Sequence, residues 1–199
     1  MAATAETPVA STGRATTPTL VACLCAFVVM VMGSAGLGGA YSYSRYAIRR
    51  ANPGEKFFAK EMKFNNYAAF ILLFTFVLAS LAIGWAVTSL RVNNRRWSAG
   101  GFGFTVVLNL AAMNILWFIG SEWEAAVNAN PWWLHAYTLL FFAGLVTLAA
   151  TIAAGLGLAR VVTGQANAEQ PHQAMAASWI QHAALVVWIV VYTLIFLYK

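Results

Sequence analysis

Carboxylates are the side chains that would let a membrane protein relay protons or bind a coupling cation. Aspartate is absent from all 199 residues of this chain, and glutamate occurs six times. Each glutamate falls in a segment that we expect to be a tail or a loop: Glu6, Glu55, Glu61, Glu122, Glu124 and Glu169. The apolar stretches of the sequence therefore offer no buried acid, and we predict that the chain has no catalytic residues of its own.

Cysteine and histidine are the remaining candidates for metal or haem ligands. Cys23 and Cys25 would lie about 200° apart around a helix, so we interpret them as small packing residues rather than a disulfide or a metal site. A haem needs two histidines that face each other at one depth, whereas His135 and His182 fall near opposite ends of successive antiparallel spans. His172 lies in the connection between them. We expect no haem or metal site, and we interpret His182 as a hydrogen-bonded structural residue within the bundle, with a functional contact as the alternative.

The elements that must position these residues are five long apolar segments. The chain is 61% hydrophobic and 9% charged, with a mean hydropathy of +0.69, whereas roughly a quarter of the residues in a soluble domain are charged. Each segment has about the 20 residues with which a helix crosses the membrane. Barrel strands would alternate in polarity, which these segments do not. We predict an all-α integral membrane bundle of five transmembrane helices, at about residues 19–43, 66–90, 101–119, 135–158 and 176–197.

Residues 1–18 differ from the rest in composition. They are rich in Ala, Thr, Ser and Pro and lack an apolar periodicity, which predicts a flexible N-terminal tail before a transmembrane domain at 19–199. A cleavable signal is not expected, because the segment from Arg14 to Tyr43 is longer than a signal core of roughly 7 to 15 residues.

The polar residues inside the spans are amides and hydroxyls. We interpret Asn109 and Asn114 as interhelical hydrogen-bonding residues, with a substrate site as the alternative. Small residues four positions apart predict close helix approach, within the chain or with a neighbour. These pairs are Ala35 with Gly39, Gly36 with Ala40, Ser80 with Gly84, and Ala150 with Ala154.

Two connections carry distinctive side chains. We interpret the basic first connection as a solvated loop whose long side chains reach the headgroups, with docking on an acidic partner or on anionic lipid as the alternative. The aromatic connection between the third and fourth spans predicts an interfacial belt, with a contact for a cationic partner such as a cytochrome as the alternative. Their residues are Arg45, Arg49, Arg50, Lys56, Lys60 and Lys63 in the first, and Trp117, Glu122, Trp123, Glu124, Trp132 and Trp133 in the second.

The order of several short motifs resembles subunit III of the haem-copper terminal oxidases, in its five-helix form. HAALVVW, from His182 to Trp188, resembles the family's HFVDVVW. The segment HAYTLLFFAGLVTLAATIAAGLGLAR is similar to FYxxTGFHGLHVxxGxxxLxxxxxR, and it matches Tyr137, Phe142, Gly144, Leu145 and Arg160. GSEWE, ending at Glu124, resembles the family's GQxYE, and AGLGGAY at 35–41 resembles AGLFxAY.

The chain departs from this family at its polar intramembrane residues. Ala143 and Val146 stand at the two histidines of FHGLH, and Leu185 stands at the aspartate of HFVD. Met30 or a near neighbour stands at the buried glutamate of SExMFF. The resemblance therefore implies a divergent member in which the scaffold is retained without the proton-supply or lipid-headgroup chemistry of those residues.

The resemblance implies a non-catalytic accessory subunit that supports assembly and stability of the catalytic subunit of a cytochrome c or quinol oxidase in aerobic respiration. Expected partners are that catalytic subunit, other oxidase subunits and membrane lipids, but no nucleic acid. Haem and copper belong to the catalytic subunit, and this chain holds no cofactor. Glu124, Tyr137, Gly144, Arg160, His182 and Trp188 are the expected structural or partner contacts.

The same resemblance implies a bacterial inner (plasma) membrane location, with the N-terminus inside and the C-terminus outside. A count of basic residues alone slightly favours the opposite orientation. Two alternatives to the oxidase assignment stay open: a subunit III-like component of a nitric oxide reductase, and an independent membrane transporter or lipid-binding protein.

Overall fold

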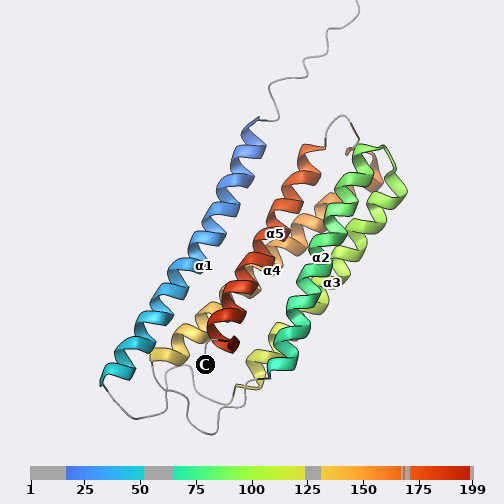
Figure 1. Ribbon diagram of the computed structural model, residues 1–199. Coiled ribbons are helices and arrows are strands. Elements are labelled where there is room, and N and C mark those ends of the chain that lie inside the picture. The colour runs from blue at the N-terminus through green and yellow to red at the C-terminus, as the bar shows by residue number, and fades with distance from the viewer. Residues whose placement is uncertain (1–16, 52–64, 124–130, 167, 169–170, 198–199) are drawn as a thin grey trace, which may run out of the picture.

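A computed structural model describes residues 17–51, 65–123, 131–166, 168 and 171–197, and all of its regular elements are helices (Figure 1). Each of the five long helices is long and apolar enough to cross a membrane. The predicted all-α class with five membrane-spanning helices is therefore confirmed. The helices are α1 (Thr17–Ala51), α2 (Asn66–Arg91), α3 (Arg95–Ser121), α4 (Pro131–Thr163) and α5 (His172–Tyr192), and a short π-helix η1 (Thr193–Leu197) continues α5.

The helices extend beyond the apolar segments that predicted them. α1 has 35 residues, which corresponds to about 52 Å, whereas the hydrocarbon core is about 30 Å thick. Arg45, Arg49 and Arg50 belong to α1 rather than to a loop, and Arg45 is buried at 5% exposure. The interpretation of these three arginines as part of a solvated loop is therefore wrong, because the helix continues past its apolar stretch. The three lysines of that connection lie outside the described residues.

The predicted N-terminal tail lies outside the described residues up to position 16. Thr17 and Pro18 begin α1 instead of ending the tail. Proline is compatible with this position because the first turn of a helix leaves its N–H groups without intrahelical partners.

Asparagine side chains start two of the helices. The Asn65 side chain accepts a hydrogen bond of 3.0 Å from the backbone N–H of Ala68, and the Asn94 side chain accepts one of 3.4 Å from that of Trp97. Between α2 and α3, Asn93 adopts a φ of 59°, a left-handed conformation that asparagine tolerates better than most residues. This short turn holds α2 and α3 as an antiparallel hairpin.

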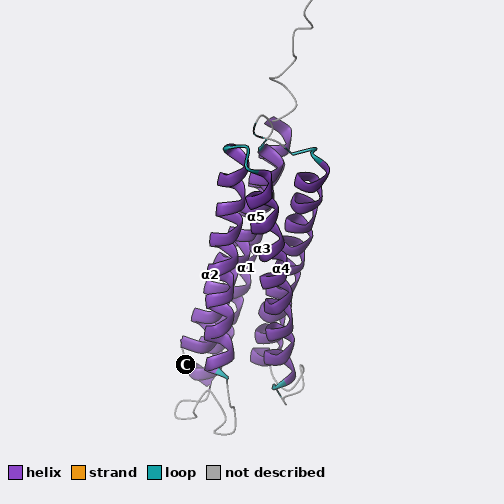
Figure 2. Ribbon diagram, turned by 90° about the vertical axis from the view of Figure 1, so that its right-hand side faces the viewer, coloured by secondary structure: helices purple, strands orange, loops and turns teal. Residues whose placement is uncertain are grey.

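α5 occupies the centre of the bundle (Figures 1 and 2). It packs against α1, α2 and α4, while α3 packs against α2 and α4. α1 lies at the edge: only 11% of its most apolar window is buried, compared with 33–50% in the other four spans. The bundle therefore consists of a packed four-helix group with α1 attached along one side.

Glycines allow the closest helix contacts. A Cβ on Gly101 would lie 2.8 Å from Ala86 Cβ and 3.0 Å from the Ala82 carbonyl oxygen, so α3 meets the backbone of α2 there. A Cβ on Gly38 would lie 2.7 Å from Leu194 Cδ1, and one on Gly157 would lie 2.7 Å from a ring carbon of Phe102. These glycines, on α3, α1 and α4, permit the close approaches, and at Gly101 the neighbour includes backbone atoms that a side chain could not displace.

The predicted small-residue pairs differ in their surroundings. Ser80 is buried, whereas a Cβ on its partner Gly84 would meet no atom within 4 Å. Ala150 and Ala154 are fully buried, which confirms close packing on α4. Gly36 and Gly39 lie on the exposed side of α1, where an added Cβ would meet no atom within 4 Å. Within the part of the chain that the structure describes, these two glycines have no atom near the position of an added Cβ.

We predict that Gly101→Ala destabilises the bundle by about 1–3 kcal/mol, because the new methyl group would overlap backbone atoms of α2. Gly100→Ala is the matched control, since a Cβ there would meet no atom within 4 Å and the gain in helix propensity is the same. The measurement is unfolding in mixed detergent micelles followed by circular dichroism. Equal stability of the two variants would contradict the prediction.

Candidate functional site

One amide pair crosses the interior of the bundle. Asn109 Nδ2 on α3 donates a hydrogen bond of 2.8 Å to Gln181 Oε1 on α5, and both side chains have 0% exposure. The pair links two helices that are not direct packing partners over most of their length. The interpretation of Asn109 as an interhelical hydrogen-bonding residue is confirmed.

The sequence reasoning missed Gln181, although it is the only amide within the apolar part of the fifth span. It was also wrong about Asn114, which is exposed and donates its side-chain hydrogen bond of 2.9 Å to the Leu110 carbonyl of its own helix. The two asparagines of α3 differ because only Asn109 is on the face that points to α5.

Four threonine hydroxyls within the spans bond along their own helices. Thr75, Thr105, Thr147 and Thr151 each donate to the carbonyl four residues earlier, at 2.7–2.9 Å. Such bonds satisfy the hydroxyl without a second helix. Among the described residues, the interior of the bundle between the terminal turns of its helices therefore has amide and hydroxyl groups but no charged side chain.

A buried polar junction joins α1 to α4 near the end of α1. The Tyr41 and Trp132 rings have centroids 5.9 Å apart, and the Arg45 guanidinium lies beside the Tyr41 hydroxyl one helical turn away. Ser44 Oγ lies 3.4 Å from His135 Nδ1. This junction combines N–H and O–H donors from two helices, and it fixes α1 against α4 at a site that the sequence reasoning did not identify.

Three of the four tryptophans of the predicted interfacial belt are buried. Trp123, Trp132 and Trp133 are buried at 7%, 1% and 5% exposure, while Trp117 is 81% exposed. The Trp132 and Trp133 rings pack edge to face at 4.7 Å, and Tyr137 donates a hydrogen bond of 2.8 Å to the Trp123 carbonyl. The three indoles pack within the chain instead of facing outward, and their depth in a membrane, which the interfacial-belt interpretation concerns, stays a prediction.

The histidines lie on separate parts of the bundle. His135 lies in the first turns of α4 and His172 begins α5, so the antiparallel arrangement puts them at opposite ends (Figure 1). His182 has its Nε2 3.3 Å from Ser178 Oγ, but its side chain is exposed. The expectation of a hydrogen-bonded His182 agrees with this contact, and the expectation that it lies within the bundle is wrong. Within the part of the chain that the structure describes, no three His, Cys, Asp or Glu side chains group as metal ligands.

No protein-family model and no curated protein sequence matches this chain. The resemblance to the oxidase subunit therefore rests on the sequence motifs alone. Glu124 lies outside the described residues. Tyr137 and Gly144 line one groove between α3 and α4, while Arg160 is in the last turn of α4. Trp188 is fully buried against Phe76 and Phe196. The structure thus distributes these residues along the bundle and does not bring them together as one site.

The apolar residues at the family's polar positions fit the packing. Ala143 and Val146 are buried at 2% and 4% exposure, and Met30 and Leu185 pack against the same core cluster. A buried polar group without a partner is costly in hydrocarbon. These four apolar side chains leave no such group in the core.

We predict that Asn109→Ala and Gln181→Ala each destabilise the bundle by about 1 kcal/mol, because each leaves the other amide buried without its partner. Their coupling energy should be about 0.6 kcal/mol in a double-mutant cycle measured by unfolding in detergent. Asn114→Ala is the control, with a change within about 0.5 kcal/mol. Strictly additive effects of the first two substitutions would show that the amide bond contributes nothing.

Proposed function

We propose that this chain is a non-catalytic accessory subunit, similar to subunit III, of a respiratory haem-copper terminal oxidase. The observation that carries the proposal is the distribution of the family-like motifs. AGLGGAY lies on α1, GSEWE starts at the end of α3, the long motif lies on α4 and HAALVVW lies on α5. The motifs therefore follow the family's order, with one on each of four helices and none on α2, on a bundle with the expected number of membrane-spanning helices.

The packing of the departures supports a scaffold role within that proposal. Ala143, Val146 and Leu185 make the interior apolar where the family has polar groups. A chain of this kind would support assembly and stability of the catalytic subunit, which would hold the haem and copper. The location implied is the inner membrane of a bacterium.

The outer side of α1 is the face that best suits a partner helix. Gly36 and Gly39 lie there with open space around them, next to the exposed Ala35. Interhelical interfaces in membranes are enriched in small residues, because these let two backbones approach closely. Lipid contact alone does not require them, so we assign this face to the contact with the catalytic subunit.

The experiment that tests the proposal is a mild-detergent pull-down of the tagged chain from its native membrane, with an optical spectrum and mass spectrometry of the same fraction. A haem-copper catalytic subunit with its haem absorbance would support the proposal. Recovery of a nitric oxide reductase would instead favour a subunit III-like component of that enzyme. A colourless, stable fraction that contains only this chain would overturn both and favour an independent transporter or lipid-binding protein.

We predict that the double substitution Gly36→Leu and Gly39→Leu lowers recovery of the catalytic subunit at least about tenfold, which corresponds to a loss of about 1.4 kcal/mol. The added side chains enter open space in the isolated chain, so its stability should not fall. Gly84→Leu is the control on α2, where a Cβ also meets no atom within 4 Å. Unchanged recovery with the α1 variant would exclude this face from the interface.

We predict that His182→Ala changes the stability of the isolated chain by less than about 0.5 kcal/mol, because its side chain is exposed and its hydrogen-bond partner, Ser178, is on the same helix. Recovery of the catalytic subunit should fall if the family-matched histidine is a partner contact. Stability is read by unfolding in detergent and recovery by the pull-down. A large loss of stability would show that His182 acts within the bundle after all.

A further inference from the structure

Five aromatic rings form a continuous row where α1 ends and α4 begins. The centroid of the Tyr41 ring on α1 lies 5.9 Å from that of Trp132 on α4, and the Trp132 ring lies 4.7 Å from that of Trp133. The Trp133 ring is 5.6 Å from that of Trp123, and the Tyr137 ring lies 5.0 Å from Trp123 and 5.8 Å from Trp133. Aromatic rings at such separations are in contact. This aromatic row therefore has a tyrosine at each end and three tryptophans between them.

The rings of the aromatic row are of the two types that lose an electron most readily. Indole and phenol are easier to oxidise than the phenylalanine and aliphatic side chains that fill most of the core. Packing alone does not require such neighbours, because the buried Trp188 has the rings of Phe76 and Phe196 beside it. An electron passes readily between oxidisable rings that are in contact. The aromatic row is therefore a path along which an oxidation can move.

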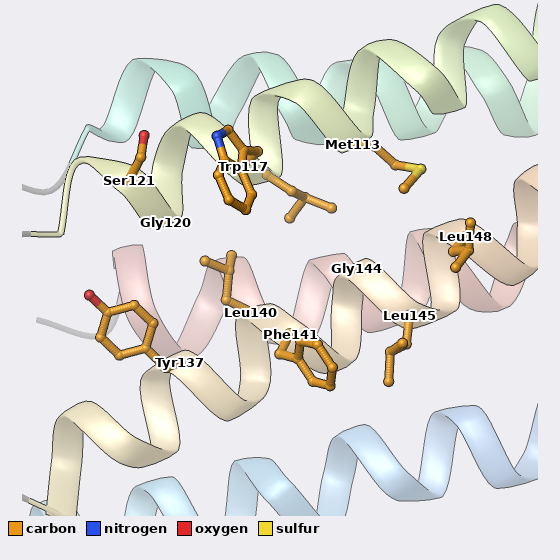
Figure 3. A pocket seen from close by; sticks show the side chains of 11 residues that line it. Met113, Trp117, Gly120, Ser121, Tyr137, Leu140, Phe141, Gly144, Leu145 and Leu148 are labelled. Carbon is orange, nitrogen blue, oxygen red and sulfur yellow. The ribbon is translucent and has the colours of Figure 1, made fainter. Parts of the chain in front are cut away.

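The two ends of the aromatic row differ in their access to the outside. Tyr41 has 0% exposure, and the three tryptophans are buried as well, so a radical on any of these rings is shielded from dissolved molecules. Tyr137 is half-buried and lines a groove between α3 and α4 on the outside of the bundle. Its hydroxyl and that of Ser121 lie at the end of the groove nearest the helix termini (Figure 3). The Tyr137 end is therefore the one from which a proton can leave.

A buried positive charge gives the aromatic row a direction. The Arg45 guanidinium lies beside the Tyr41 hydroxyl and is 5% exposed. Arginine stays protonated in proteins, so Arg45 cannot accept the phenolic proton of Tyr41. It also repels a positive charge on the nearby Tyr41 and Trp132 rings. An electron vacancy is therefore more stable at the other end, where the Tyr137 hydroxyl donates a hydrogen bond of 2.8 Å to the Trp123 carbonyl.

We propose that the aromatic row carries a one-electron oxidation from the α1–α4 junction to Tyr137. A one-electron oxidant, such as an oxygen-centred radical, takes an electron from Trp132 and leaves an indole radical cation. Trp133 then reduces Trp132, and Tyr137 reduces Trp133 directly or through Trp123. Tyr137 releases its phenolic proton to water at the groove and becomes a phenoxyl radical. In sum, the oxidant gains one electron, and Tyr137 loses one electron and one proton. The row would thus remove an oxidation from the buried core, and it does not depend on the oxidase assignment.

The experiment starts the oxidation with light at the α1 end of the full chain in detergent. A ruthenium photosensitiser is attached at Tyr43→Cys, on the exposed side of α1, and a soluble electron acceptor converts the excited label into a one-electron oxidant. Cys23→Ser and Cys25→Ser leave one thiol for attachment, and Tyr46→Phe removes a nearby exposed phenol. Transient absorption should show an indole radical followed by a phenoxyl radical, at a rate that is independent of protein concentration. Absence of the phenoxyl radical would overturn the proposal.

Two substitutions at one position test whether the oxidation passes through the aromatic row. Trp133→Phe should remove most of the phenoxyl signal, because the Trp132 ring then has no oxidisable neighbour toward Tyr137. Trp133→Tyr should restore it, since the two variants have rings of nearly the same size and only tyrosine is readily oxidised. Any effect on folding is thus shared by both variants and is checked by circular dichroism. Equal phenoxyl signals in the two variants would show that the row is not the path.

Two further substitutions identify where the oxidation ends. Tyr137→Phe and Tyr41→Phe each remove one oxygen atom and keep the ring that packs in the row. Electron paramagnetic resonance should show that Tyr137→Phe loses the phenoxyl radical and prolongs the indole radical, whereas Tyr41→Phe keeps the phenoxyl radical. The opposite result would overturn the direction, and a phenoxyl signal that survives both substitutions unchanged would exclude Tyr137 as the end point.

Discussion

The bundle depends on close contact between helices, because a bilayer provides no hydrophobic driving force to hold apolar helices together. Contact must then come from surfaces that fit, and the glycines on three helices provide them. Gly101 brings α3 against the backbone of α2, Gly157 admits the Phe102 ring, and Gly38 admits Leu194. The central position of α5 follows from the same requirement, since it contacts three helices directly and reaches α3 through Gln181.

The polar groups of the interior are arranged so that few of them require a second helix. Threonine hydroxyls bond to their own helices, and the Asn109–Gln181 pair is the exception. Charged side chains lie toward the helix ends, where Arg45 belongs to the α1–α4 junction and Arg95 donates to the Val161 carbonyl. Among the described residues, the charged side chains are therefore found toward the ends of the bundle and not in its interior.

Composition alone was sufficient to predict the class and number of the membrane helices, because each span must be apolar over the thickness of the hydrocarbon. It did not predict where the helices end, since a helix continues into water without a change in its backbone. It also did not distinguish Gly38 from Gly39 or Asn109 from Asn114, although each pair shares one helix. Whether a residue packs or stays exposed depends on which face of its helix meets a neighbour. A span that is apolar all round has no strong periodicity, so its sequence does not show which face that is.

The two outer features of the bundle lie on different sides of it, which bears on how it would sit in a larger assembly. α1 packs on α4 and α5, and its glycine face points away from them. The groove lies where α3 meets α4, and α3 is on the other side of α5 from α1 (Figure 1). A partner helix on the α1 face would therefore leave the groove open to the bilayer. Because α1 is the least buried span, contact with a partner would also stabilise the helix that the bundle itself holds most weakly.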